Sequence, residues 1–398
     1  MTFRIILDNM PSVWSPGCII QGKVVLNSSQ DEAVSSVSIR FSGKEKTLMR
    51  GGQNSKYYGE VRFFSYVQHL FRGNYTFSAS KQLEWPFQFV FPDKPDNRQS
   101  DISTDKCFRG PNDHFLPPTF SYETSMFSSY PAECRVQYKL SAELQRPSSF
   151  SFRFGSLSEE KRLSFIPHRL EASPTVMFLS APITWTIHSK KILPEFENYE
   201  STMKEKVATM FSSRSKLPSS TFKIFTKLPS KVILGQSIPL LVSATHLPED
   251  STTKIVPIIR LRQLSVAIEL ITAICASSTF GRTHDDEKSN KRTIANHTDL
   301  DIPLEPKPCN MGELLNVICV PFLTPSFVSD IIKRRYALHL KIVVECAGCT
   351  KTIRASRMTF EILSWSYLQI PLGPPPQLPL GVEEAREKDG EQLPSYQP

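Results

Sequence analysis

Apolar and polar residues alternate strictly along several segments of the chain. In the segment 37–42 every odd position is apolar or small and every even position is polar, and the same period of two runs through 135–144, 264–270 and 336–344. Because successive side chains of a strand point to opposite faces, this pattern predicts antiparallel strands that are buried on one face. Turn residues at short intervals between such runs favour β-sandwiches, so the predicted fold class is all-β.

A short motif occurs twice, each time ahead of a predicted strand. Residues 116–120 read Leu-Pro-Pro-Thr-Phe, and residues 323–327 read Leu-Thr-Pro-Ser-Phe. A glycine-led strand entry precedes each copy at a similar spacing, with Gly17 in the first and Gly235 in the second. Repeated order at matched spacing predicts two related modules rather than one fold with an extension.

The repeat divides the chain into four predicted parts. We expect an N-terminal β-sandwich at 1–190, a hinge at 191–217 with some helical tendency, and a C-terminal β-sandwich at 218–366. The tail at 367–398 combines a proline run with many charges. Such a composition buries too little apolar surface to fold, so we expect the tail to be disordered.

Residues 279–300 are rich in aspartate, lysine, asparagine and threonine. We expect them to form a mobile excursion from the second sandwich. The run His284-Asp285-Asp286-Glu287 within this segment contains potential metal ligands. Adjacent residues on a flexible backbone do not define a coordination shell, so we interpret the run as a solvated loop.

Length and composition favour an ordinary soluble protein with two cores. The chain has 398 residues, and its 31 prolines suit loops and edge strands better than helical bundles. We find neither the apolar core of a signal peptide nor a run long enough to span a membrane, and therefore expect a cytoplasmic protein. In that compartment the eight cysteines are expected to be reduced thiols.

The net charge of +8 is moderate, and the basic residues are dispersed along the chain. It is consistent with peripheral contact with an anionic membrane and equally with ordinary solvated faces. The sequence contains no dense basic tract that would indicate nucleic-acid binding.

Cys346-Ala347-Gly348-Cys349 is the segment most suggestive of chemistry. A Cys-x-x-Cys pair can be half of a zinc site or a redox pair. Alanine and glycine between the cysteines suit a hairpin turn after the strand, and Cys309 and Cys319 lie too far apart for a second zinc knuckle. A structural role is favoured. Since no catalytic motif occurs elsewhere, we predict no enzyme activity, no cofactor and no metal.

The order of the motifs along the chain resembles the arrestin superfamily, and more closely the α-arrestins of fungi. The run 15–26 resembles that family's opening strand pair, and 85–92 a later landmark. Residues 116–120 and 138–142 are similar to its first-domain signature, and 325–338 to the second-domain counterpart. The residues that carry this fold signature are Gly17, Gly22, Pro118, Phe120, Pro325 and Phe327.

The resemblance covers roughly residues 3–365. It implies two tandem arrestin-like, immunoglobulin-type β-sandwich domains joined by a short hinge. It also implies a protein without catalytic apparatus. From the residues alone, the three glycines of the strand entries are best explained by turn and bulge geometry.

The tail contains a Leu-Pro-x-Tyr element formed by Leu393, Pro394 and Tyr396. WW domains bind such peptides because proline favours the extended polyproline II shape before binding. The resemblance implies that this element recruits a HECT-type ubiquitin ligase, although many α-arrestins carry several copies and this chain has one. It also suggests ubiquitination of the adaptor, with Lys388 as a possible acceptor.

These observations predict an adaptor that recognises cytosolic regions of membrane transporters or receptors. It would recruit a WW-domain HECT-type ubiquitin ligase and promote ubiquitin-dependent endocytosis, moving from the cytoplasm to the plasma membrane or endosomes. An alternative is an arrestin-fold sorting scaffold, similar in shape to retromer subunits, that recruits no ligase. A thiol- or zinc-dependent enzyme centred on Cys346 and Cys349 is a third class.

Overall fold

The protein is described from a computed structural model. It describes residues 1–51, 55–79, 81–96, 99–100, 108, 115–124, 131–147, 156–167, 178–196, 199, 217–277, 283–318 and 323–364. The helical tendency expected in the hinge and the whole Leu-Pro-x-Tyr element lie outside the described residues. Nearly all regular structure in the described part is β-strand, which confirms the predicted all-β class.

Within the residues that the structure describes, the first module comprises nine strands. They are β1 (Thr2–Leu7), β2 (Ile19–Asn27), β3 (Glu32–Arg50), β4 (Lys56–Phe77), β5 (Gln82–Val90), β6 (Gln99–Ser100), β7 (Phe120–Glu123), β8 (Ala132–Gln145) and β9 (Ser156–Leu163). The three-stranded sheet β1-β2-β5 packs against the sheet that contains β4, β3, β8 and β9, and their inward side chains form one core.

In its described part, the second module comprises the later strands and four short helical turns. Its strands are β10 (Phe178–His188), β11 (Ser219–Pro229), β12 (Lys231–Ile233), β13 (Leu241–Leu247), β14 (Ile259–Ser277), β15 (Thr283–His297), β16 (Ile302–Pro303), β17 (Cys309–Asn310), β18 (Phe327–Val328), β19 (Ile332–Cys346) and β20 (Cys349–Leu363). Its helices are η4 (Lys190–Ile192), η5 (Pro194–Phe196), η7 (Pro248–Asp250) and α2 (Met311–Leu314).

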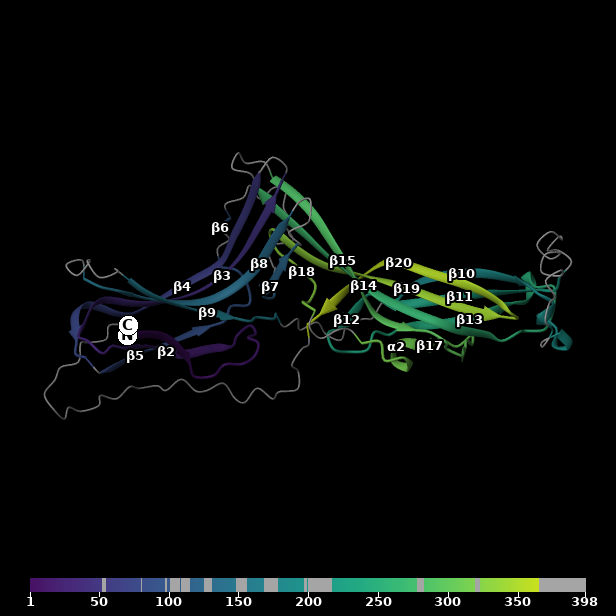
Figure 1. The fold of residues 1–398 in the computed structure, drawn as a ribbon, viewed down its shortest axis with the longest axis horizontal. Helices are drawn as coiled ribbons and strands as arrows, with labels where there is room; N and C mark the ends of the chain where they lie inside the picture. Colours follow the sequence, from purple (N-terminus) through teal and green to yellow (C-terminus); the bar gives the residue numbers. More distant parts are fainter. Residues whose placement is uncertain are drawn as a thin grey trace.

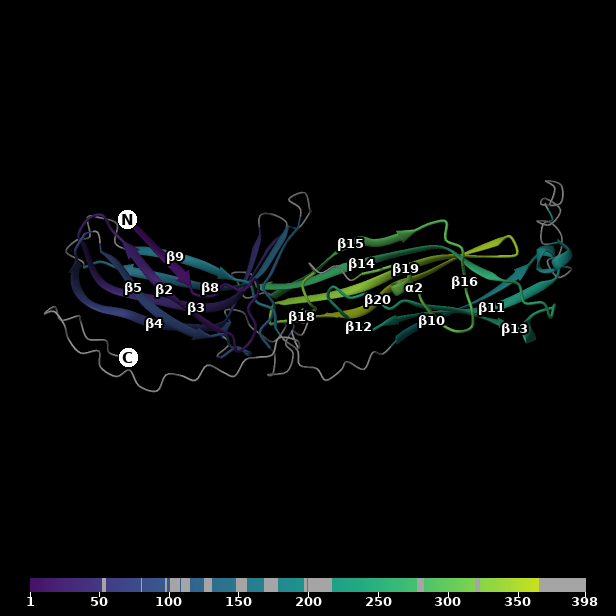
Figure 2. The same ribbon diagram turned by 90° about the horizontal axis from the view of Figure 1, so that it is seen from below.

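The two modules lie end to end and give the molecule an elongated shape (Figures 1 and 2). In the second module the sheet β10-β11-β13-β17 packs against β12-β20-β19-β14 with β15 attached. Long strands of both modules rise toward each other near the middle, where β14 pairs with β4 (Figure 1). Through this pairing one sheet of each sandwich becomes part of a single continuous sheet.

The two copies of the repeated motif close their sandwiches with the same hydrogen bonds. Tyr138 on β8 donates to the carbonyl oxygen of Pro117 at 2.6 Å, and Tyr336 on β19 donates to that of Thr324 at 2.5 Å. Pro117 and Thr324 are the second residues of their motifs. Both tyrosines are fully buried, so each hydroxyl satisfies a carbonyl that water cannot reach.

The fourth residue of each motif, Thr119 or Ser326, also makes the same hydrogen bonds in the two modules. Thr119 exchanges two hydrogen bonds with the backbone of Phe165, one through its own N–H and one through its hydroxyl. Ser326 exchanges the corresponding pair with the backbone of Ile362. The structure therefore supports the interpretation of two related modules.

The glycines of the two strand entries also correspond. Gly17 and Gly235 both have a φ of +77°, and each is followed by a residue whose N–H closes a four-residue turn. Gly22 is needed for a different reason, because a Cβ atom there would lie 2.2 Å from the carbonyl oxygen of Ile6 on β1. The turn geometry expected for Gly17 and Gly235 is observed, while Gly22 permits close strand packing.

One expectation about the second module is wrong. Most of the segment expected to be a mobile excursion forms β15, which pairs with β14 from Thr283 to His297. The run 284–287 is thus part of a strand and not of a loop. Because β15 is an edge strand with largely exposed side chains on both faces, it shows no apolar alternation in the sequence.

Candidate functional site

The two modules meet at a buried contact that we call the joint. It is formed by Glu45, Thr47, Tyr57 and Phe120 of the first module with Cys275, His284, Phe327 and Ser329–Arg334 of the second. At its upper edge Ser277 pairs with Tyr58, and the Thr47 hydroxyl donates to the Cys275 carbonyl at 2.7 Å. Beside them the rings of Tyr57 and His284 lie 4.3 Å apart.

The last residues of the two repeated motifs touch each other across the joint. Phe120 begins β7, Phe327 begins β18, and each is 6% exposed. Their ring centroids lie 5.3 Å apart at 72°, a favourable edge-to-face arrangement. In this one pair, equivalent residues of the two modules contact each other, as residues on the two-fold axis of a symmetric dimer do.

Glu45 lies on β3 and is fully buried at the joint. Its carboxylate oxygens lie 2.5 Å from the Ser329 hydroxyl and 3.3 Å from the N–H of Ile331. The Ser329 hydroxyl is the donor to Glu45 and also lies 2.8 Å from the Ile332 carbonyl oxygen, so these two acceptors share its single proton. Burial, reinforced by the charge of Asp330, raises the pKa of Glu45 to about 8. At neutral pH the carboxyl group therefore keeps its proton in this buried site.

Arg334 on β19 is the cation of the joint and is 5% exposed. Its guanidinium donates to the Thr272 hydroxyl at 2.5 Å and to the Tyr336 hydroxyl at 3.1 Å. The same group lies 5.5 Å from the ring centroid of Phe120, within cation–π range. Among the described residues, no carboxylate lies within ion-pair distance of this guanidinium.

Glu45 and Arg334 occupy related places in the two modules. On β3 and β8, Glu45 pairs with Val136, two residues beyond the pair that contains Tyr138. On β14 and β19, Thr272 pairs with Arg334, two residues beyond the pair that contains Tyr336. The equivalent pairs thus contain an acid in the first module and a base in the second, on opposite members of the pair, since Arg334 shares its strand with Tyr336 whereas Glu45 faces the strand of Tyr138.

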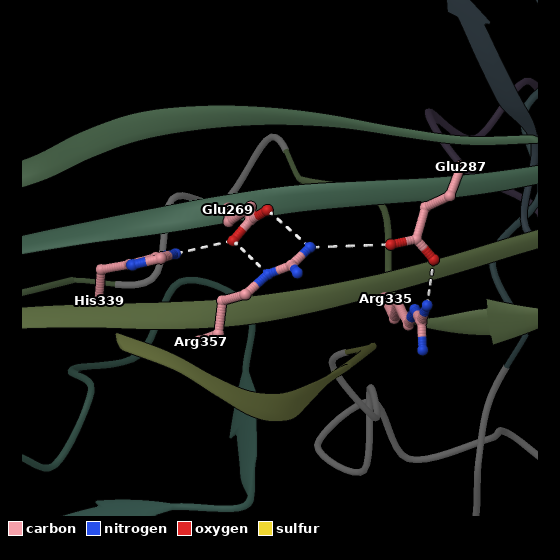
Figure 3. A network of polar contacts seen from close by, with 5 residues as sticks. All are labelled: Glu269, Glu287, Arg335, His339 and Arg357. Carbon is pink, nitrogen blue, oxygen red and sulfur yellow. Dashed lines mark hydrogen bonds and ion pairs between the residues drawn. The ribbon is translucent and has the colours of Figure 1, made fainter. Parts of the chain in front are cut away.

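A second polar network lies on the outer face of the second module (Figure 3). Glu269 on β14 accepts from His339 Nε2 at 2.8 Å and from Arg357 at 3.2 and 3.3 Å. The hydrogen bond from His339 and the contacts with Arg357 lower the pKa of Glu269. Glu287 extends the network, since it pairs with Arg335 and lies 3.8 Å from Arg357.

Arg357 reaches this network from an irregular point of β20. The ladder between β19 and β20 shifts register between Leu338 and Leu340, and Arg357 has a φ of +54°. A left-handed backbone is unfavourable for an arginine, so the strand carries local strain where it directs this side chain to Glu269. The network links side chains of β14, β15, β19 and β20 (Figure 3).

The cysteine pair lies at a hairpin turn, as expected. β19 ends at Cys346 and β20 begins at Cys349, and the two residues pair across the strands. Burial raises the pKa of Cys346 to about 12 and also raises that of Cys349, so neither thiol is a ready nucleophile. Within the described residues, no three histidine, cysteine or acidic side chains are grouped so as to hold a metal ion.

The structure brings together only part of the predicted site. Phe120 and Phe327 meet at the joint, Pro118 and Pro325 precede them in their motifs, and Gly17 and Gly22 lie at the far strand entry. Leu393, Pro394, Tyr396 and Lys388 all lie outside the described residues.

Sequence reasoning missed Glu45 and Arg334, although a signal was present. Both lie at positions of an alternating strand whose side chains point to the buried face. Glu45 lies four residues after Phe41 on the same face of β3, and Arg334 lies on the same face of β19 as Tyr336 and Leu338. A charged residue in the buried phase indicates a polar contact inside the protein.

The arrangement can do three things. It can hold two sandwiches in one orientation, respond to protonation of Glu45, and present a charged outer face.

No helix in the described part of the chain is long and apolar enough to cross a bilayer.

A family model described as "Arrestin (or S-antigen), N-terminal domain" matches residues 3–162. This range runs from β1 into β9 and therefore covers the strands of the first module. No curated protein matches the chain.

Proposed function

This chain belongs to the arrestin superfamily through its N-terminal domain, and from that premise we propose that it is a trafficking adaptor of the α-arrestin type. It recognises cytosolic regions of membrane transporters or receptors and recruits a WW-domain HECT-type ubiquitin ligase. The match of the family model to residues 3–162 carries the adaptor role. Arrestin-family proteins are generally non-enzymatic adaptors, and the joint offers contacts for holding two modules rather than a reacting group.

Ligase recruitment is the more specific part of the proposal, and the tail supports it. Leu393 and Pro394 would enter the aromatic groove of a WW domain, and the ring of Tyr396 would fill the neighbouring pocket. The second module ends near the joint, where the Ser364 hydroxyl donates to the Pro167 carbonyl at 2.7 Å. A covalent tether between that point and Leu393 spans at most roughly 100 Å, so a bound ligase stays close to cargo held by the modules.

The direct test is binding of a fluorescent peptide spanning 381–398 to isolated WW domains of a HECT-type ligase. We expect micromolar binding that the Tyr396→Ala peptide loses. If no WW domain binds the peptide, ligase recruitment through this element is refuted. The adaptor role then rests on the arrestin domain alone, as in a sorting scaffold of the retromer type.

Cargo ubiquitination gives a second test in cells. The full-length Tyr396→Ala protein is expected to leave its cargo at the plasma membrane while the folded modules remain intact. Unchanged cargo turnover in this variant would favour the scaffold function. Ubiquitination of the adaptor itself at Lys388 is expected to disappear in Lys388→Arg.

The net charge of +8 supports contact with the anionic inner leaflet during recruitment to the plasma membrane or endosomes. Binding to vesicles that contain phosphatidylserine is expected to weaken as salt rises. Binding that is absent, or that is indifferent to salt, would remove this part of the proposal.

A further inference from the structure

Glu45 is the titratable group through which the first module contacts the second. Its carboxyl group is fully buried on the core face of β3. Its hydrogen bonds with described residues come from the Ser329 hydroxyl and the N–H groups of Asp330 and Ile331, all in the second module. Beside it, apolar side chains of the second module enter the first core, namely Ile274, Cys275, Ala276, Phe327, Ile331 and Ile332. The second module therefore covers Glu45, and water reaches its carboxyl group when the joint opens.

The second-module groups that face Glu45 do not provide it with a counter-charge. Asp330 is 8% exposed, and its negative charge adds to the effect of burial in raising the pKa of Glu45 to about 8. Arg334 is the cation of the joint, but its guanidinium donates to the hydroxyl groups of Thr272 and Tyr336 and lies beyond ion-pair distance of Glu45. An ionised Glu45 would thus be a buried charge beside another of the same sign, which is costly.

The first-module groups that face Glu45 are uncharged near neutral pH. On the core face, the titratable side chains of the neighbouring strands are Tyr122 of β7 and Cys134 and Tyr138 of β8. Burial raises the pKa of all three above its ordinary value. The lysines on either side of Glu45 point to the opposite face of β3, where both pair with Glu60. Closing the joint therefore favours the protonated form of Glu45.

We propose that the joint is a proton-linked latch between the modules, closed in acid and progressively released as the pH rises through neutrality. When the joint opens, the hydrated Glu45 returns to its ordinary pKa of 4.5 and gives up its proton. Its contribution to closure is therefore complete below about pH 4.5 and is lost as the pH rises to about 8. Between these values opening releases close to one proton, so the ratio of open to closed joint should rise about tenfold for each pH unit. The latch is a property of the fold and requires neither a ligase nor a cargo.

Two buried thiols can report on the opening of the joint. Cys275 lies at the joint and packs in the first core, whereas Cys346 lies at the hairpin between β19 and β20 and packs in the second core. The test is reaction of the full-length protein with N-ethylmaleimide at several pH values, with the rate at each cysteine measured by mass spectrometry. Because the reagent attacks the thiolate at both sites, the ratio of the two rates cancels their common dependence on pH. We expect the ratio of the Cys275 rate to the Cys346 rate to rise about tenfold between about pH 6 and pH 7.

Three variants assign this rise to Glu45. Glu45→Gln removes the titrating group, so the ratio of rates should become independent of pH. Glu60→Gln, on the neighbouring strand β4, is the matched control and should keep the full rise. Asp330→Asn keeps Glu45 but removes the neighbouring charge, so the rise should level off at a lower pH, and this variant tests the latch even if Glu45→Gln does not fold.

The proposal is overturned if the ratio of rates in the natural protein does not change with pH, or if a folded Glu45→Gln protein keeps the rise. Equal acceleration at Cys275 and Cys346 would also overturn it, because both cysteines would then react through unfolding of the whole protein.

Discussion

The two modules share backbone hydrogen bonds and turn geometry, but their cores are filled with different side chains. In both, a buried tyrosine bonds the carbonyl of the repeated motif and a left-handed glycine turns the chain into an early strand. The first core is crowded with rings, namely Phe41, Phe64, Phe91, Tyr138 and Phe165. The second core is mostly aliphatic, and Tyr336 has Phe360 as its ring neighbour at 6.2 Å. The hydrogen bonds from these tyrosines to the backbone are therefore common to both modules, whereas the core between the sheets is filled by different side chains in each.

The modules differ most where they touch. The equivalent cross-strand pairs are Glu45 with Val136 in the first module and Thr272 with Arg334 in the second. The difference teaches that two related surfaces form one specific joint when their equivalent pairs carry different polar side chains, a protonated acid in the first module and an arginine in the second.

The largest effect is expected from removing the rings that meet at the joint. Phe120→Ala and Phe327→Ala should each lower the free energy of unfolding by about 3 kcal/mol, as for other buried phenylalanines. Because the two rings contact each other, the double variant should cost less than the sum of the single variants. Denaturant unfolding measures this, with the exposed Phe115→Ala as control. Strict additivity would mean that the rings do not share one contact.

The raised pKa of Glu45, on the first-module side of the joint, should make the free energy of unfolding depend on pH. Its folded-state pKa of about 8 lies above the ordinary value of 4.5, so the native state holds a proton that the unfolded state loses. Its favourable contribution is therefore complete below about pH 4.5 and is lost as the pH rises to about 8.

Glu45→Gln keeps polar atoms that can hydrogen-bond Ser329 and Ile331 but has no titrating group. At pH 8 this variant should be more stable than the natural protein by about 1 kcal/mol or more, and the difference should vanish near pH 4.5. Thermal unfolding across this pH range measures it. A difference that is constant with pH would contradict a protonated Glu45.

The two tyrosine bonds allow the modules to be compared directly. Tyr138→Phe should cost about 1–2 kcal/mol, because a buried carbonyl loses its donor. Tyr336→Phe should cost more, since Tyr336 also accepts from Arg334. Unfolding curves of both variants decide the order. Equal costs would show that the bond from Arg334 contributes nothing to stability.

The smallest effect is expected at the two matching glycines. Gly17→Ala and Gly235→Ala should each cost about 1 kcal/mol, because alanine is strained at a φ of +77°. No atom lies within 4 Å of a Cβ built on Gly17, so backbone strain alone determines its cost. Thermal unfolding should show equal shifts for the two variants. A clearly larger loss of stability in one of the two variants would show that the two turns are not equivalent.

Much of the fold follows from the sequence, because alternation within one strand is a local signal. Segments such as 135–144 and 336–344 bury one face, and their pattern reports that face directly. β15 gave no such signal, since an exposed edge strand needs no apolar phase.

The joint was harder to predict, because its contacts join residues far apart in the chain. Glu45 meets Ser329 only after both sandwiches have formed, and no spacing in the sequence encodes that pairing. The repeated motif indicated where each module closes. It did not indicate that Phe120 and Phe327 would pack against each other.

β15 has a consequence for the behaviour of the protein in a crowded cell. It is a 15-residue strand at the border of a large sheet, a place that invites pairing with a strand of another chain. Its exposed charged residues, Asp285, Glu287, Lys291 and Arg292, make such pairing unfavourable, because a neighbouring strand would have to accommodate their charges. The charged residues that mask the apolar alternation expected of a strand in this segment therefore also protect the strand against aggregation.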